Sequence, residues 1–217
     1  MAALVKIFLI LALGFASTFI VLNAAGVLTT AQIEGWLTTA SSLSPGLVAL
    51  IIAALLFADL FIAMPTLTLC LLAGYFLGFG MGSLATITGL TLAGICGHGL
   101  SRHYGDRLLR RIARSEQQIS EAKSMFQTHG FLMILIARAM PIIPEVSACL
   151  SGITRMRFSR FLAAWWLGSV PYCLIAAYAG SVSTVDDPMP AVYTALALSG
   201  TLWTVWFYFY RRVWAKI

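Results

Sequence analysis

Three ionisable residues stand in otherwise apolar stretches of this chain of 217 residues. Asp59 follows the apolar run 47–58, Arg138 lies near the end of the apolar run 130–139, and Glu145 follows shortly afterwards. On insertion scales a charged side chain at the centre of a membrane helix costs about 2.5–3.5 kcal/mol, so such groups face a bundle interior or a wet cavity. There an acid can bind protons, and a guanidinium can bind phosphate through two parallel hydrogen bonds.

Each of these residues also has a structural explanation. Asp59 could serve only as a member of an ion pair. Arg138 could pair with Asp59 or Glu145, or extend its guanidinium to the membrane surface. Glu145 could neutralise Arg138, or carry protons, because desolvation favours the uncharged form of a carboxyl group. The sequence leaves these alternatives open.

The composition is that of a membrane protein. Hydrophobic residues make up 60% of the chain and charged residues 10%, whereas a soluble domain carries about 25% charged residues. The net charge of +6 comes from clustered arginines and lysines, which fits membrane topology better than nucleic-acid binding. The four cysteines lack metal-ligand spacing, and no motif of an enzyme or a cofactor site appears. We therefore expect no metal, no cofactor and no enzymatic activity.

Apolar runs long enough to cross a bilayer predict the helices. A crossing needs roughly 20 apolar residues. We expect a single all-α membrane domain over residues 1–217, with about four full transmembrane helices. The first run is longer than the apolar region of a signal peptide, so we expect it to be retained. The predicted spans are 4–28, 83–100, 161–180 and 191–210.

Basic residues predict the orientation of these spans. The polar segment 101–129 has the spacing of an amphipathic helix and is rich in arginine, so we expect it to be cytoplasmic. Arg155, Arg157 and Arg160 form a second basic cluster, so the apolar segment between the two must enter and leave on one side. The break in such a re-entrant hairpin falls at Pro141 and Pro144.

The same reasoning places both termini in the cytoplasm and makes residues 47–81 a second re-entrant hairpin, broken at Pro65 and entering from the outside. The two hairpins echo each other in sequence. Ala-Met-Pro at 63–65 begins a run that ends at Gly74, and Ala-Met-Pro at 139–141 begins a run that ends at Gly152. Inverted repeats with broken helices that meet near the midplane are the plan of many transporters.

Two blocks of sequence resemble the DedA superfamily, also called the VTT or SNARE-associated Golgi protein family. The first is Met-Pro at 64–65 with LAGYFLG at 72–78, and the second is RAMPIIP at 138–144 with the residues that follow to Pro171. The resemblance covers about residues 59–180 and is closest to the branch named for a yeast Golgi-associated protein. It implies two facing re-entrant hairpins and movement of lipids across the bilayer, with polyprenyl phosphates or phospholipids as substrates and proton coupling proposed.

In this resemblance Asp59 takes the place of the family's intramembrane acid and Arg138 that of its first hairpin arginine. Many bacterial members carry a second arginine six residues later, where this chain has Pro144 followed by Glu145. The departure weakens an assignment to polyprenyl phosphate and favours a phospholipid or another anionic lipid.

The leading hypothesis is a lipid translocase of the bacterial inner membrane. Arg138 would bind the phosphate of an anionic or phosphate-bearing headgroup, and Asp59 with Glu145 would handle protons or gate access. A second hypothesis is a proton- or ion-coupled transporter of a small solute. A third is a non-transporting scaffold that binds partners through its basic loop.

Overall fold

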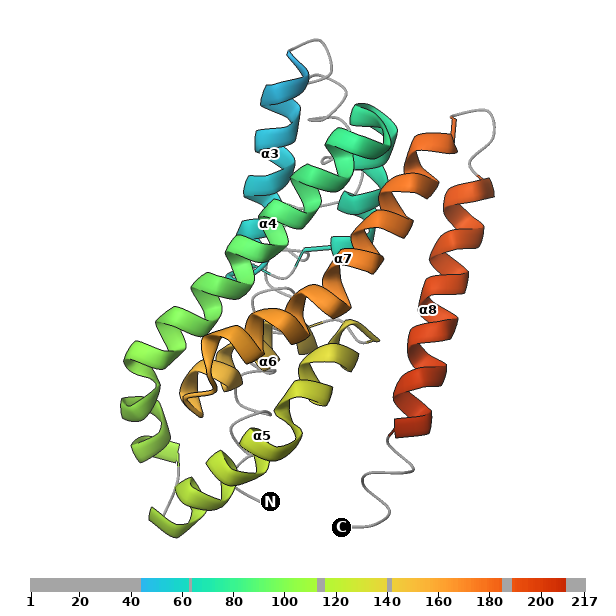
Figure 1. Cartoon of the computed structure of the whole chain (residues 1–217). Coiled ribbons are helices and arrows are strands. Elements are labelled where there is room, and N and C mark those ends of the chain that lie inside the picture. The colour runs from blue at the N-terminus through green and yellow to red at the C-terminus, as the bar shows by residue number, and fades with distance from the viewer. Residues whose placement is uncertain (1–43, 63, 113–115, 140–141, 185–188, 210–217) are drawn as a thin grey trace, which may run out of the picture.

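The computed structural model describes residues 44–62, 64–112, 116–139, 142–184 and 189–209, which form helices joined by turns and contain no strand (Figure 1). The predicted all-α class is confirmed over these residues. The predicted span 4–28, both termini and Pro141 lie outside them. In chain order the elements are α3 (Pro45–Ala58), α4 (Thr66–Ile112), α5 (Glu116–Ile136), the 3-10 helix η1 (Ala137–Ala139), α6 (Ile143–Ile153), α7 (Phe158–Val182) and α8 (Met189–Phe209).

The first helical hairpin runs from α3 into the start of α4. Pro45 occupies the first turn of α3, where its missing N–H leaves no hydrogen bond unmade. Helical structure ends at Ala58 and resumes at Thr66, directly after Pro65. Gly78 then interrupts α4 with φ 73° and ψ 174°, a conformation essentially restricted to glycine. Helix α4 therefore consists of a short arm, 66–77, and a long arm, 79–112.

The second hairpin runs from α5 through η1 into α6. Ile142 precedes α6 with a left-handed φ of 71°, which is rare for a β-branched residue. Pro144 lies in the first turn of α6, where proline is tolerated, so the interruption comes before it. Figure 1 shows α3 and α5 approaching from opposite ends of the molecule, with both interruptions near its middle.

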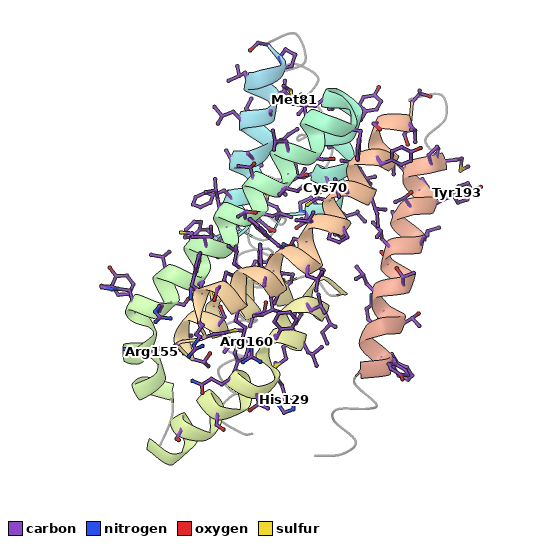
Figure 2. The ribbon with its side chains drawn as sticks, viewed as in Figure 1. Cys70, Met81, His129, Arg155, Arg160 and Tyr193 are labelled. Atoms are coloured by element: carbon purple, nitrogen blue, oxygen red, sulfur yellow. The ribbon has the colours of Figure 1, made fainter. Side chains whose placement is uncertain are left out.

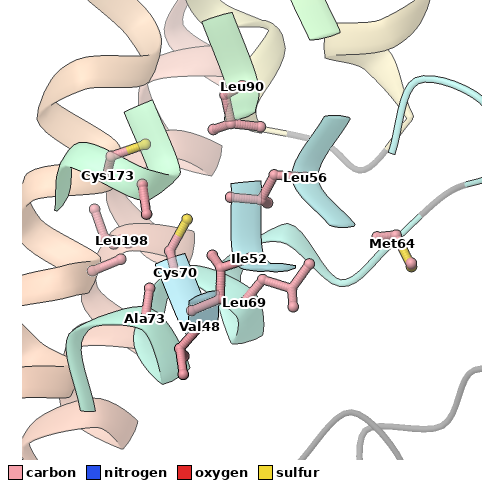
Figure 3. Close-up of a cluster of buried hydrophobic side chains, with 12 residues drawn as sticks. Val48, Ile52, Leu56, Met64, Leu69, Cys70, Ala73, Leu90, Cys173 and Leu198 are labelled. Atoms are coloured by element: carbon pink, nitrogen blue, oxygen red, sulfur yellow. The ribbon is translucent and has the colours of Figure 1, made fainter. Parts of the chain in front are cut away.

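The core is divided between the two hairpins. One buried cluster joins α3, α4, α7 and α8 around Ile52, Leu56 and Leu69 (Figure 3). The other joins α5, α6 and α7 around Phe126, Val146 and Phe161. Helix α7 contributes to both clusters, so it fixes the position of one hairpin relative to the other.

Two glycines that the sequence places at the ends of the hairpin runs lie at close helix contacts. A Cβ at Gly74 would collide with the backbone of Ala177 on α7. A Cβ at Gly152 would collide with the backbone of His98 and Arg102 on α4. Small residues allow helix backbones to approach this closely. Each hairpin is thereby packed directly against a long helix.

The polar segment 101–129 differs from the single amphipathic helix predicted for it. Its first part continues α4 to Ile112, and its second part belongs to α5, which starts at Glu116 and runs on into the apolar residues up to Ile136. The polar segment is divided because α4 extends into it from the apolar residues before it, and α5 extends from it into the apolar residues after it.

Two helices in the described part of the chain are long and apolar enough to cross a membrane. These candidate spans are Thr66–Gly105 and Phe158–Val182, and the first contains the reversal at Gly78. The long arm from residue 79 to Gly105 alone would extend about 40 Å, which exceeds a hydrocarbon core of about 30 Å. Each hairpin is thus followed in the chain by a helix of membrane-crossing length.

Candidate functional site

Asp59 lies at the interruption of the first hairpin, directly after the last residue of α3. Its side chain is 3% exposed. One carboxylate oxygen accepts a hydrogen bond from the backbone N–H of Met64 at 2.7 Å, and the other accepts from the Thr66 hydroxyl at 2.9 Å. The carboxylate therefore satisfies donors that the interrupted helix leaves free. This contact gives Asp59 a structural role in addition to any role in transport.

Arg138 lies on η1 and is held by three side chains of α7. Its Nε and one terminal nitrogen both donate to the Ser169 hydroxyl, at 3.2 and 3.1 Å. Its guanidinium carbon lies 4.9 Å from the ring centre of Trp165 and 6.0 Å from that of Tyr172. Aromatic faces attract a guanidinium at such distances. Among the described residues the second terminal nitrogen has no hydrogen-bond acceptor.

Helix periodicity on α7 assembles this support. Trp165, Ser169 and Tyr172 follow one another at steps of four and three residues, so they share a helix face. Trp165 is fixed by a hydrogen bond from its indole N–H to the Leu90 carbonyl at 3.0 Å. A Cβ at Gly94 would collide with the Trp165 ring, so glycine there makes room for it. Helix α4 thereby positions the ring that supports Arg138.

Glu145 brings the second hairpin into contact with the first. Its side chain is 8% exposed, and its carboxyl group lies within hydrogen-bonding reach of the Asp59 carboxyl. Arg138 interacts electrostatically with both acids. Among these three described residues no direct ion pair is present, and Arg138 donates to Ser169. The structure thus brings together all three ionisable residues that the sequence singled out.

The site joins one cation to two acids at the point where both hairpins are interrupted. Two buried carboxylates in contact repel each other unless a proton lies between them. The positive charge of Arg138 interacts favourably with both carboxylates. Arg138 is partly exposed, whereas Asp59 and Glu145 are buried. The arrangement can bind an anionic group at its outer edge and hold a proton deeper inside.

Tryptophans in apolar helices are common at membrane interfaces, but Trp165 lies inside the protein. Trp165 is 4% exposed and lies under Arg138, whereas its neighbour Trp166 is 47% exposed, as a belt residue should be. Ser169 and Tyr172 were also missed as partners of Arg138. Their spacing of four and three residues from Trp165 was the available signal.

His98 is a further ionisable residue buried among the helices. It is 2% exposed, stacks on Phe161 with ring centres 4.6 Å apart, and contacts the Ser151 hydroxyl at 2.7 Å through Nδ1. Its other ring nitrogen, Nε2, has no hydrogen-bond partner among the described residues. His98 therefore joins α4, α6 and α7.

The second basic cluster lies at the end of the molecule from which α5 rises. Figure 2 shows Arg155 and Arg160 near His129 at this end and Met81 at the opposite end. Arg160 donates to the Gln127 carbonyl at 2.9 Å, and Arg102 donates to the Met156 carbonyl at 3.1 Å. Arg102 thus links α4 to the turn between α6 and α7, and Arg160 links the first turn of α7 to α5.

The fold and the site define an all-helical membrane protein in which two interrupted hairpins meet at a cluster of buried charges. Residues 64–182 match the model of the VTT domain, and this chain belongs to that family. The resemblance inferred from the two sequence blocks is therefore confirmed. No solved structure matches the chain.

Three relatives can be compared over part of their length. The chain is 26% identical over 153 residues to the uncharacterized protein YqeD of Bacillus subtilis, covering 69% of this chain and 73% of that one. It is 28% identical over 110 residues to the uncharacterized membrane protein slr0232 of Synechocystis, covering 46% and 50%. It is 25% identical over 108 residues to undecaprenyl phosphate transporter A of Bacillus subtilis, covering 48% and 54%. The chain thus spans about half the length of the latter two relatives.

Proposed function

We propose that this protein moves a lipid with a phosphate-bearing headgroup across the inner membrane of a bacterium. The observation that carries the proposal is Arg138, a partly exposed guanidinium held by Ser169 and Trp165 rather than by an ion pair among the described residues. A guanidinium in such a setting binds phosphate oxygens. The name of the relative in Bacillus subtilis, undecaprenyl phosphate transporter A, supports a phosphorylated lipid as the class of substrate.

In this proposal the two hairpins are re-entrant and enter the bilayer from opposite faces. The end bearing Arg155 and Arg160 faces the cytoplasm, in accord with the positive-inside rule. The interruptions then lie at membrane depth, where irregular backbone is tolerated only if it is buried in protein or lines a cavity. Asp59 and Glu145 hold a proton whose release and uptake alter the contact between the hairpins.

The test is transbilayer movement in liposomes that contain the purified protein. Fluorescent polyprenyl phosphate and a fluorescent phospholipid are measured separately, with protein-free liposomes and liposomes containing Arg138→Ala beside them. We expect protein-dependent movement of at least one lipid and its loss in Arg138→Ala. If folded wild-type protein moves neither lipid, the proposal is wrong, and uptake of a small solute driven by a proton gradient becomes the function to test.

A further inference from the structure

His98 lies at the joint of three helices and has one ring nitrogen without a partner. It belongs to the long arm of α4 and is 2% exposed. Its Nδ1 lies 2.7 Å from the Ser151 hydroxyl of α6, and its ring stacks on Phe161 of α7. Among the described residues Nε2 has no hydrogen-bond partner. A buried polar atom without a partner is rare in native proteins and calls for an explanation.

The hydrogen bonds of Ser151 fix the tautomer of the neutral imidazole. The Ser151 hydroxyl donates to the Ala148 carbonyl at 2.6 Å. A hydroxyl has a single proton, so towards His98 this oxygen can only accept. The proton of that hydrogen bond therefore lies on Nδ1 of His98. Because a neutral imidazole carries one N–H group, Nε2 is an unprotonated acceptor.

Stability alone does not explain a histidine at this position. Phenylalanine would keep a ring on Phe161 and would bring no nitrogen that lacks a partner. The Ser151 hydroxyl would stay satisfied, because it donates to Ala148. Replacing a polar group by an apolar one of similar shape is nearly neutral or stabilising when no partner is left unsatisfied. The two ring nitrogens of His98 therefore point to a function.

A continuous stack of side chains connects His98 to Arg138. The ring centres of His98 and Phe161 are 4.6 Å apart, and those of Phe161 and Trp165 are 5.6 Å apart. The Arg138 guanidinium carbon lies 4.9 Å from the centre of the Trp165 ring. The hydrogen bond to Ser151 ties the same imidazole to α6. His98 thus supports both the second hairpin and the ring beneath Arg138.

A proton on Nε2 is incompatible with this buried position. The charged neighbour of the imidazole is Arg102, one turn further along α4, and it would repel an imidazolium. Helix α6 faces the ring with Ser151, and α7 faces it with Phe158 and Phe161. Among the described residues no acid acts on the ring. Burial of an uncompensated charge is strongly unfavourable, so the ring has to leave its place when it is protonated.

We infer that His98 is a proton-binding residue that positions Arg138 while it is neutral and releases this support when Nε2 takes up a proton. The inference rests on the proposed function and adds a site outside the acid pair. Phe158 lies beside the imidazole, is 45% exposed and starts α7, so this edge of the site is near the protein surface. An imidazole that reaches water changes its charge near pH about 6.5. The described arrangement is therefore favoured above this pH, and transport should be lost as the pH falls below it.

The first test is the tautomer of His98 in the wild-type protein. In protein that contains isotope-labelled histidine, the nitrogen NMR signals absent from His98→Phe belong to His98. At pH about 8 we expect a protonated Nδ1 and an unprotonated Nε2, as the contact with Ser151 requires. The opposite tautomer, or an imidazolium at this pH, would overturn the inference.

The second test is the rate of lipid movement in liposomes between pH about 8 and about 5.5, the range in which histidine titrates. The wild-type rate should fall at least about threefold more over this range than that of His98→Phe, which keeps its ring in place at either pH. His103→Phe removes an exposed histidine of α4 and should follow the wild-type protein. All three proteins are measured with the same fluorescent lipid, so titration of the lipid cancels in the comparison.

The outcomes separate the inference from the function beneath it. If the wild-type protein and His98→Phe show the same pH dependence, the role of His98 is wrong while lipid transport stands. If His98→Phe does not fold, His98→Asn takes its place, because an amide cannot bind the proton either. Movement of no lipid by the wild-type protein would overturn the proposed function, whereas the NMR measurement would still test the protonation of His98.

Discussion

At the scale of single residues, the site is organised around a cation that is held without an ion pair. Arg138 is supported by a hydroxyl and two aromatic rings, although two acids lie close enough to interact with it electrostatically. A direct ion pair would occupy the guanidinium and reduce its capacity to bind phosphate. Cation–π contacts hold it in position without using its N–H donors.

Replacement of Trp165 tests this support. Trp165→Leu removes the ring beneath Arg138, and a desolvated cation–π contact contributes about 2 kcal/mol, so we expect transport to fall at least about tenfold. Trp165→Phe keeps a ring and should retain part of the activity. Trp166→Leu is the matched control, because Trp166 is 47% exposed, and it should transport almost normally. Equal loss in Trp165→Leu and Trp166→Leu would contradict the account.

Asp59 should contribute to stability as well as to transport. Asp59→Ala leaves the buried N–H of Met64 without its acceptor, which costs about 1–3 kcal/mol, whereas Asp59→Asn keeps an oxygen that can accept this bond. In detergent, thermal unfolding of Asp59→Ala should therefore occur at a lower temperature than that of Asp59→Asn. Both variants should lose transport that depends on the acid pair. Equal melting temperatures of the two variants would show that the hydrogen bond with Met64 does not contribute to stability.

The sequence predicts the charged residues of the site better than their partners. Asp59, Arg138 and Glu145 stand out because charge in an apolar run is costly and therefore rare. Trp165 does not, because a tryptophan in an apolar helix is usual at either a membrane surface or a core. Only the packing of α7 against α4 and η1 decides between these environments.

At the scale of elements, interruptions of helices create the site. In both hairpins the helix is interrupted near the middle of the molecule. One acid stands beside each interruption, and these two acids lie together. Pro65 stands directly before a helix, and Pro144 stands in the first turn of one. These prolines therefore mark where helices start.

Gly78 and Gly80 form a matched pair for testing the reversal within α4. A Cβ at either position meets nothing within 4 Å, but only Gly78 has a positive φ. We expect Gly78→Ala to destabilise the protein by about 1–3 kcal/mol, because a residue with a Cβ is strained there. Gly80→Ala should be neutral or slightly stabilising, since alanine favours helix. Thermal unfolding of the two variants measures the difference, and equal melting temperatures would contradict the assigned reversal.

Hydrophobic runs and prolines predict the helices, but they do not predict the chain reversal at Gly78. It stands in a series of glycines spaced four apart, Gly74, Gly78 and Gly82, a pattern typical of helix packing. Gly74 does pack against α7, yet Gly78 reverses the chain. The glycine spacing shows only that these positions lack a side chain. Whether that absence serves close packing or backbone conformation depends on tertiary structure.

At the scale of the whole molecule, the two buried hydrophobic clusters form two halves of the core, and α7 joins them. Each half belongs to one hairpin, and the charged site lies between the halves. This division agrees with the inverted repeat indicated by the two Ala-Met-Pro segments. The topology could be predicted from sequence, because clustered arginines indicate which ends of the apolar segments lie on the cytoplasmic side of the membrane. The contact between Asp59 and Glu145 could not be predicted, because it depends on the relative placement of the two hairpins.

The proposed topology predicts that opposite ends of the molecule face opposite sides of the membrane. Gly46 and Ser159 are exposed residues next to the two hairpins, at the start of α3 and of α7. We expect a membrane-impermeant maleimide to label Gly46→Cys from the outside only and Ser159→Cys from the cytoplasmic side only. The wild-type chain, treated identically, gives the background from its own cysteines. Labelling of both positions from one side would contradict the inverted arrangement.

The most direct test of the central claim is the rate of phospholipid movement in liposomes containing Arg138→Ala, Arg138→Lys or Arg157→Ala. Arg157 is exposed in the turn before α7, so Arg157→Ala removes the same charge away from the site. We expect Arg157→Ala to match the wild-type protein. Arg138→Lys should be slower, because an ammonium cannot replace the planar fork, and Arg138→Ala should be inactive. Wild-type rates in folded Arg138→Ala would contradict the claim that this guanidinium binds the headgroup.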